Sequence, residues 1–172
     1  MEWKEIKGWL NEEEAEVLQR LTKDKVVIEV GSYFGRSTVC IADVARRVYS
    51  IDTHKALGDG QTQMSSRTTW DEFKRNIKGY TNIFPFVGES SYWLEIMPES
   101  DVVFIDGMHK YPMVKSEILA LRNKVDLFVF HDYNLPQIKL AVESMIDIEG
   151  SIRTMAWGKV KPTWKSLKVS PI

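Results

Sequence analysis

Residues 26–40 read VVIEVGSYFGRSTVC, and this stretch decides the fold. Its first five residues are apolar except for Glu29, which is typical of a β-strand buried on both faces of a parallel sheet. A turn framed by Gly31 and Gly35 comes next, and residues 36–47 have the spacing of a helix. A strand, a glycine turn and a helix in this order predict the first unit of an α/β fold.

The same alternation continues along the chain. We predict further strands at residues 48–51, 83–87, 102–105 and 127–130, and helices near residues 70–78, 92–96, 112–121 and 136–148. Residues 1–22 form a helical lead-in, in which Asn11 is the N-cap and Glu14 follows three residues later. The segments SIRTMAW and TWKSLKV, separated by GKVKP, predict an antiparallel hairpin within residues 151–172. The sheet is therefore expected to be mostly parallel and closed by a C-terminal antiparallel pair.

Size and charge limit the classes of protein to consider. A chain of 172 residues, 44% of them hydrophobic, suits one domain over residues 1–172. A formal net charge of -1 gives no overall attraction to nucleic acid or to an anionic membrane. The N-terminus lacks the apolar run of a signal peptide, and no segment approaches the roughly 20 apolar residues of a spanning helix. We expect a cytoplasmic protein without nucleic-acid or membrane partners, with the single Cys40 packed in the core.

Polar residues follow each of the later strands where the strand ends. Asp52, Glu89 and Asp106 come after the second, third and fourth strands, and His131 with Asp132 after the fifth. Ligands of an open parallel sheet bind beyond the carboxyl ends of its strands, near the point where the strand order reverses. The sequence therefore predicts that these side chains meet in one cleft.

The glycine turn and Asp52 indicate a nucleoside. Asp52 lies 21 residues after Gly31, where a carboxylate accepts both hydroxyls of a ribose. The dinucleotide fingerprint needs glycine two places after the first, and this chain has Tyr33 there. S-adenosylmethionine has a ribose and no phosphate, so a looser turn suffices for it. The competing interpretation is a plain strand-to-helix turn beside a solvated Asp52.

GESSY, beginning at Gly88, opens like a nucleophile elbow, but Tyr92 stands where the elbow needs glycine, so a serine hydrolase is not expected. Glu89 and Ser90 either contact the adenine or ribose, or Ser90 caps the following helix. His54 is expected to be solvated or to gate substrate. The long polar segment 53–69 is a candidate lid.

FIDGMHKY and FHDYN carry the sharper chemical signal. Asp106 ends one strand and Asp132 follows the next, and two such carboxylates can hold a hard divalent cation. His109, three residues after Asp106, is a candidate base for a hydroxyl whose pKa the metal lowers.

Together, EVGSYFGRST, YSID, VVFIDGMHKY and VFHDYN resemble the class I S-adenosylmethionine-dependent methyltransferases over about residues 26–146. The order of the last two motifs resembles a small subgroup, the macrocin-type sugar O-methyltransferases and cephalosporin-hydroxylase-like proteins. The resemblance implies a Rossmann-like sheet of seven strands with the last antiparallel, and it makes a homo-oligomer plausible.

The resemblance also implies a site. Its S-adenosylmethionine would contact the turn and the strand ends, through Glu29, Gly31, Ser32, Tyr33, Gly35, Asp52, Thr53, Glu89, Ser90 and Asp106. Asp106 and Asp132 would be metal ligands, with Asp106 and His109 catalytic. His131 stands where related members tend to carry a second acid, so it is either a third ligand, which suits manganese, iron or zinc better than magnesium, or a group that orients Asp132.

The function predicted is methyl transfer to a hydroxyl oxygen of a small molecule, assisted by a divalent cation, Mg²⁺ or Mn²⁺ first. Three alternatives stay open. They are metal-independent transfer to nitrogen or carbon, a non-catalytic S-adenosylmethionine-binding subunit, and a nicotinamide-dependent oxidoreductase, which Tyr33 disfavours.

Overall fold

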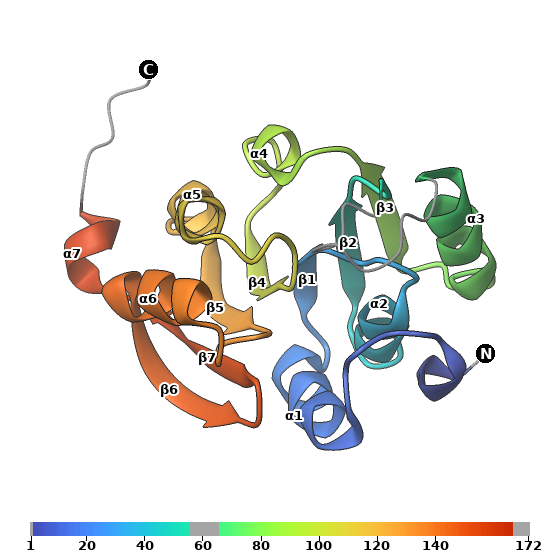
Figure 1. The fold of residues 1–172 in the computed structure, drawn as a ribbon, viewed down its shortest axis with the longest axis horizontal. Helices are drawn as coiled ribbons and strands as arrows, with labels where there is room; N and C mark the ends of the chain where they lie inside the picture. Colours follow the sequence, from blue (N-terminus) through green and yellow to red (C-terminus); the bar gives the residue numbers. More distant parts are fainter. Residues whose placement is uncertain (1, 56–65, 167–172) are drawn as a thin grey trace.

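The computed structural model describes residues 2–55 and 66–166 and contains a seven-stranded sheet between two layers of helices (Figure 1). The strands are β1 (Val26–Val30), β2 (Arg47–Asp52), β3 (Ile83–Val87), β4 (Ser100–Ile105), β5 (Val125–Phe130), β6 (Ile146–Ile152) and β7 (Met155–Val160). The helices are η1 (Trp3–Glu5), α1 (Glu12–Thr22), α2 (Arg36–Ala42), α3 (Ser66–Asn76), α4 (Ser90–Trp93), α5 (Tyr111–Leu121), α6 (Pro136–Met145) and α7 (Pro162–Lys165).

The strand order is β3-β2-β1-β4-β5-β7-β6, in which β1 to β5 pair in parallel and β7 pairs antiparallel to β5 and β6. The predicted class, a Rossmann-like α/β fold with a C-terminal antiparallel hairpin, is confirmed. Strand order reverses between β1 and β4, so the carboxyl ends of these two strands form the place where an open sheet of this kind binds ligands.

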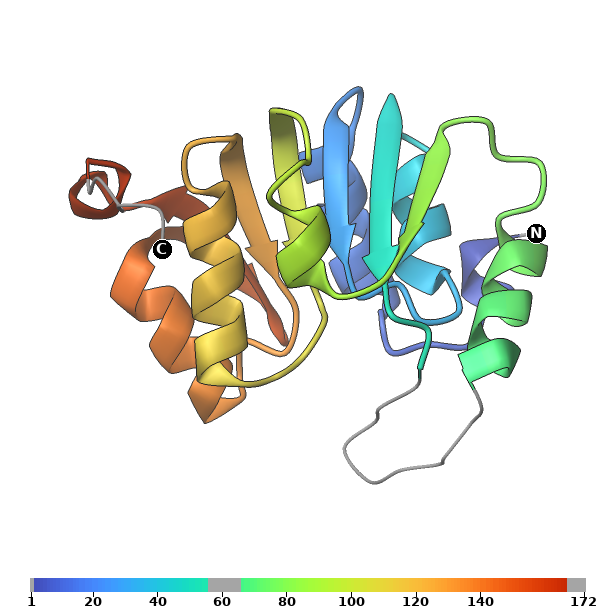
Figure 2. The same cartoon turned by 90° about the horizontal axis from the view of Figure 1, so that it is seen from above.

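Alternate residues of the central strands supply two cores. Ile28, Val103 and Phe128 face α4, α5 and α6, whereas Val27 and Val102 face α1 and α2. Figure 2 shows these two helical layers on opposite faces of the sheet. The strands were predictable because both faces are covered, which leaves few polar positions within them.

The lead-in begins as predicted at Asn11, whose side chain accepts a hydrogen bond from the Glu14 N–H at 3.0 Å, and Glu14 completes the capping box. The segment before it is fastened by Arg36. Its guanidinium donates to the carbonyls of Lys4, Ile6 and Leu10 and lies 5.0 Å from the Trp3 ring centroid. The N-terminal segment is therefore held against the start of α2.

The hairpin lies earlier than the sequence predicted. It spans β6 and β7, with Arg153 at its turn in the left-handed region (φ 52°), and residues 162–165 form a short helix instead of a strand. Helix α6 ends at Met145, and β6 starts at the next residue, Ile146. Strand β6 lies at the exposed edge of the sheet and has few buried positions, so its sequence does not show the alternation of apolar and polar residues that is typical of a strand. Helix α2 also ends earlier than predicted, at Ala42.

Candidate active site

A cavity of about 520 Å³ opens at the carboxyl ends of the parallel strands. Its wall combines the ends of β1 to β5 with residues 7–10 of the N-terminal segment and parts of α5. The predicted residues Gly31, Ser32, Tyr33, Asp52, Thr53, Glu89, Ser90, Asp106, His109, His131 and Asp132 all line it. The predicted convergence of strand-end residues is thus present, in a cavity within the size range of small-molecule sites.

Asp52 holds the glycine turn in place. Its Oδ2 accepts hydrogen bonds from the N–H groups of Ser32 (2.8 Å) and Tyr33 (2.7 Å), and its Oδ1 accepts one from the N–H of His54 (2.6 Å). An ionised carboxylate has about four acceptor positions, so capacity remains for a ligand hydroxyl. Asp52 therefore shapes the turn and is also placed to meet a ribose.

Gly31 is required by geometry. Its φ is +89°, and a Cβ added there would lie 2.3 Å from the backbone oxygen of Asp106. The turn after β1 therefore packs directly against the backbone at the end of β4, which only glycine permits. Tyr33, two residues later, also has a positive φ (48°), a strained conformation that the Asp52 hydrogen bond helps to hold.

Two of the predicted cofactor residues, Glu29 and Gly35, lie outside the cavity wall. Glu29 is fully buried on the α2 side of the sheet, where its carboxyl oxygens accept hydrogen bonds from the hydroxyls of Ser37 and Thr38. Burial raises the pKa of Glu29 to about 7. Gly35 is the N-cap of α2 with φ 92° and faces the ring of Phe73. Both residues hold the turn in shape, and their contact with the cofactor stays a prediction.

His54 also differs from expectation. It is buried rather than solvated, with its ring 4.9 Å from the centroids of Trp70 and Phe73, and burial lowers its pKa. Most of the predicted lid at residues 53–69 lies outside the described residues.

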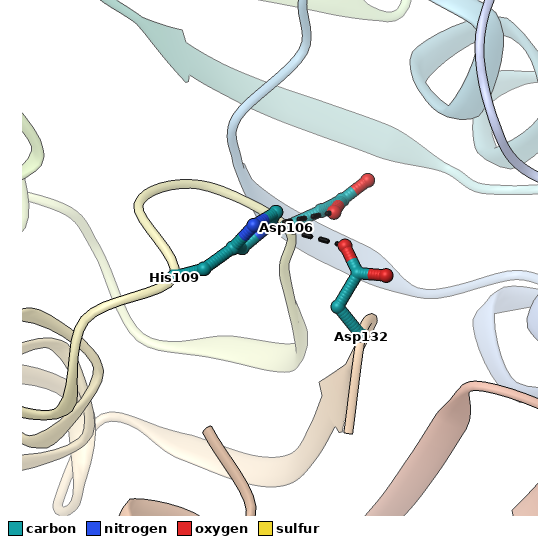
Figure 3. Close-up of side chains that lie close together, drawn as sticks. All are labelled: Asp106, His109 and Asp132. Carbon is teal, nitrogen blue, oxygen red and sulfur yellow. Dashed lines mark ion pairs between the residues drawn. The ribbon is translucent and has the colours of Figure 1, made fainter. Parts of the chain in front are cut away.

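The carboxylates after β4 and β5 come together around an imidazole, as Figure 3 shows. His109 Nε2 lies 3.1 Å from Asp132 Oδ2 and 3.9 Å from Asp106 Oδ1. One ligand atom from each of the three residues falls within 4.8 Å of the others, which suits a bound metal ion. The structure therefore unites the predicted ligands Asp106 and Asp132, with His109 as the third member of the cluster.

His131 lies behind this cluster, with only 4% of its side chain exposed. Its Nδ1 is 3.3 Å from Asp106 Oδ1 and 3.4 Å from Asp132 Oδ2, and its Nε2 is 3.3 Å from Glu14 Oε2. The same Glu14 carboxylate accepts hydrogen bonds from the N–H (3.0 Å) and hydroxyl (2.6 Å) of Thr154. Of the two interpretations from sequence, this placement favours a residue that orients the two aspartates.

The cluster has a strong negative potential. Hydrogen bonding to Asp106 and Asp132 raises the pKa of His109 to about 10. Burial by itself would lower the pKa of His131, but the same two carboxylates outweigh burial and raise it to about 11. The two imidazoles in turn lower the pKa of Asp132 well below its usual range. A divalent cation bound here would compete with the His109 proton, because an imidazole binds a metal only in its neutral form.

At the end of β3, Glu89 is exposed and is the N-cap of α4, without a side-chain capping bond. Ser90 does not cap the helix. Its hydroxyl instead donates a hydrogen bond of 2.7 Å to Glu117 Oε1 on α5.

The matched family is described as a methyltransferase domain, and the match covers residues 28–133. The chain belongs to this family. As a member it is a methyltransferase that uses S-adenosylmethionine as methyl donor, and the sites expected from the glycine turn and the strand ends lie inside the matched region. The family places the chain among enzymes, against the oxidoreductase and non-catalytic alternatives.

Solved structures of low sequence identity share the methyltransferase's fold. The precorrin 8w decarboxylase of Methanobacterium thermoautotrophicum is 16% identical with a TM-score of 0.67, over 91% of this chain and 95% of the other. Precorrin-6y C5,15-methyltransferase of Geobacter metallireducens is 16% identical with a TM-score of 0.64, over 91% and 94%. A putative methyltransferase of Streptococcus mutans, solved with S-adenosylhomocysteine, is 10% identical with a TM-score of 0.60, over 87% and 98%.

No curated protein sequence matches the methyltransferase significantly. Among the described residues, no helix has the length and apolar character needed to cross a membrane.

Sequence reasoning missed three parts of the methyltransferase's site. Glu14 and Glu117 are acids on amphipathic helices, where the sequence pattern does not distinguish a buried acid from a solvated one. The rim residue Trp9, which is 73% exposed and lies 5.4 Å from the Tyr33 ring, precedes the lead-in helix and has no motif. Only the fold brings Glu117 and Trp9 to the cavity wall, and Glu14 to His131 behind the cluster.

Proposed function

We propose that the methyltransferase transfers a methyl group to a hydroxyl oxygen of a small molecule, with a divalent cation held by Asp106, His109 and Asp132. The observation that carries this proposal is the three-residue cluster on the wall of the cavity that also contains the glycine turn and Asp52. A donor site and a cation site in one cavity are what metal-assisted methyl transfer needs.

The donor set fits such a cation. Two carboxylate oxygens and one imidazole nitrogen suit Mn²⁺, Fe²⁺ or Zn²⁺, and Mg²⁺ less well. A bound divalent cation lowers the pKa of a coordinated hydroxyl, which makes its oxygen a nucleophile near neutral pH. In this arrangement His109 is a ligand rather than the base assigned from sequence, because its Nε2 already faces both carboxylates.

The residues of the chain then position the reaction. The turn at Gly31 and the Asp52 carboxylate orient the donor. Asp106, which follows β4, packs its backbone against Gly31 and contributes its carboxylate to the cluster. The acceptor oxygen attacks the methyl carbon in line with the departing sulfur, so the C–S bond breaks as the O–C bond forms. Holding the two atoms in line supplies much of the rate acceleration in such transfers.

The net charge of -1 supports a small acceptor, because binding a nucleic acid depends on neutralising many phosphates with basic residues. The exposed Trp9 at the rim offers an apolar surface to such an acceptor.

The test combines metal titration with two variants. Asp106→Asn and Asp132→Asn should lose Mn²⁺ binding in calorimetry and lower turnover of a hydroxyl-bearing acceptor panel at least about 100-fold. Asp126→Asn, an exposed change on β5 away from the cavity, is the matched control. Metal-independent turnover that survives both cluster variants would disprove the cation's role.

A second candidate is metal-independent transfer to nitrogen or carbon. The observation in its favour is that His109 Nε2 lies within 4 Å of both carboxylates, so a protonated imidazole gives the aspartates a cationic partner within the chain. Full activity in excess chelator, with amines preferred over alcohols in the acceptor panel, would select this alternative.

A further inference from the structure

Glu117 is a buried acid on the cavity wall that neither the glycine turn nor the cation cluster explains. It lies on α5 with 2% of its surface exposed, on the same helix face as the core residues Val114, Ile118 and Leu121. Its Oε1 accepts the hydrogen bond from Ser90, but its buried Oε2 has no hydrogen-bond partner among the described residues. Leaving a buried carboxyl oxygen unpaired is costly, so a position like this usually serves a ligand.

The position of Glu117 relative to the strand ends indicates which part of the donor it meets. Gly31, Asp52 and Ser90 follow β1, β2 and β3, which are neighbours in the sheet, and all three line the cavity. If Asp52 receives the ribose, the adenine base attached to this ribose extends toward the end of β3. There the wall contains Ser90, with Glu117 bonded to it, and Met113 one turn earlier on α5.

We propose that Glu117 is a specificity-determining residue of the donor site, and that its Oε2 accepts a hydrogen bond from the exocyclic amino group of adenine. The inference rests on S-adenosylmethionine as donor, but not on the cation or the acceptor. Adenine carries an amino donor at C6, where guanine and hypoxanthine carry a carbonyl oxygen, so an unpaired carboxylate oxygen facing C6 favours adenine.

The chemistry of the carboxyl agrees with this role. Burial raises the pKa of Glu117 to about 7, opposed by the hydrogen bond from Ser90, so the acceptor form is available in mildly alkaline solution. The Ser90 hydroxyl fixes the carboxyl by occupying Oε1, which leaves only Oε2 for a ligand. The competing interpretation is that the Ser90–Glu117 bond merely joins α4 to α5, and a ligand-side test separates the two.

The experiment measures calorimetric binding of S-adenosylhomocysteine and of its 6-deamino analogue, in which the purine lacks the amino group, at pH 8.5. Hydrogen bonds to charged groups predict that the wild-type protein binds the amino compound at least about tenfold more tightly. Glu117→Leu should remove this preference and weaken S-adenosylhomocysteine to the level of the analogue. Glu117→Gln, which keeps an acceptor oxygen and the partner for Ser90, should retain a reduced preference.

Asp126→Asn is the control, since it alters an exposed carboxyl on β5 that does not line the cavity, and it should keep the wild-type ratio. Equal binding of both ligands by the wild-type protein overturns the proposal, as does a wild-type ratio in Glu117→Leu. The wild-type measurement and the Gln variant decide the matter even if Glu117→Leu does not fold. Tight binding of S-adenosylhomocysteine with no amino preference refutes only the role of Glu117, whereas no binding at all refutes the donor assignment as well.

Discussion

Replacing Glu29 by glutamine should change how the stability of the fold depends on pH. Glu29 is fully buried beneath the glycine turn, and its two oxygens accept hydrogen bonds from Ser37 and Thr38. Burial raises its pKa in the folded state from 4.5 to about 7. An amide has the same shape and can pair with both hydroxyls, because each hydroxyl can donate or accept.

The sign follows from proton linkage. Between pH 4.5 and about 7 the folded state holds the Glu29 proton while the unfolded state has lost it. The contribution of Glu29 to stability therefore falls as pH rises through this window, by about 1.4 kcal/mol per pH unit, and this contribution levels off above it. The whole cost of ionising this buried group is about 3 kcal/mol. Glu117, with its pKa also raised to about 7, adds a second slope of the same sign.

The assay is urea unfolding at half-unit steps from pH 4.5 to pH 6.5, comparing the wild-type protein with Glu29→Gln and Glu117→Gln. The upper limit lies below the range in which His109 and His131, whose pKa values are raised to about 10 and about 11, add a slope of the same sign. Within this window each variant should lose about half of the wild-type decline, and the double variant should lose most of it. The reasoning is refuted if Glu29→Gln unfolds with the wild-type pH slope, because the buried carboxyl would then not be the group that titrates.

Three further changes test the turn and its supports. Gly31→Ala should lower the free energy of unfolding in urea by about 3 kcal/mol, because Gly31 has a positive φ and a Cβ there would meet the Asp106 carbonyl. Gly79→Ala should lower it by only about 1–2 kcal/mol, because Gly79 has φ +101° but nothing lies within 4 Å of its added Cβ. Equal costs would contradict the close approach at Gly31. Asp52→Asn replaces an acceptor oxygen by an amide N–H donor that faces backbone N–H groups. Calorimetry should therefore show that S-adenosylhomocysteine binds at least about tenfold more weakly. Unchanged affinity would show that Asp52 is not part of the donor site. Arg36→Met removes the hydrogen bonds that hold the N-terminal segment. Limited proteolysis should then cut within residues 2–10 much faster than in the wild-type protein. An unchanged rate of cleavage would show that apolar packing alone holds the segment.

The sequence was sufficient for the central parallel strands because burial on both faces leaves a continuous apolar run in each of them. VVIEV was predicted with the bounds that the structure has. IFPFV was also predicted with its observed bounds, although it is the edge strand β3 and only Ile83 in it is buried, because its residues are apolar throughout. The hairpin was misplaced because β6 is an edge strand with one buried residue at Ile146, so its period is hidden, and Gly150 reads as a loop residue. In the structure Gly150 lies at a register shift, where a Cβ would come within 2.3 Å of the Trp157 ring.

The sequence predicted those site residues that directly follow the ends of the predicted strands. Asp52, Asp106 and Asp132 converge because a parallel sheet brings the carboxyl ends of its strands to one edge, a rule that needs no coordinates. The relative roles of His109 and His131 were not predictable. Each lies within a few residues of an aspartate, and which imidazole faces the cavity depends on the path of the loop after β4 and the φ of 52° at Asp132.

Glu14 shows why local patterns understate what a residue does. The sequence identified it as the capping-box partner of Asn11, and the structure confirms that role. The same carboxylate is fully buried, contacts His131, and accepts hydrogen bonds from Thr154 at the hairpin turn, 140 residues away. It thereby joins the first helix and the last hairpin to the histidine behind Asp106 and Asp132. The positions of the two aspartates therefore depend on α1 and the hairpin through Glu14 and His131, so variants of α1 or the hairpin can alter activity without touching a ligand.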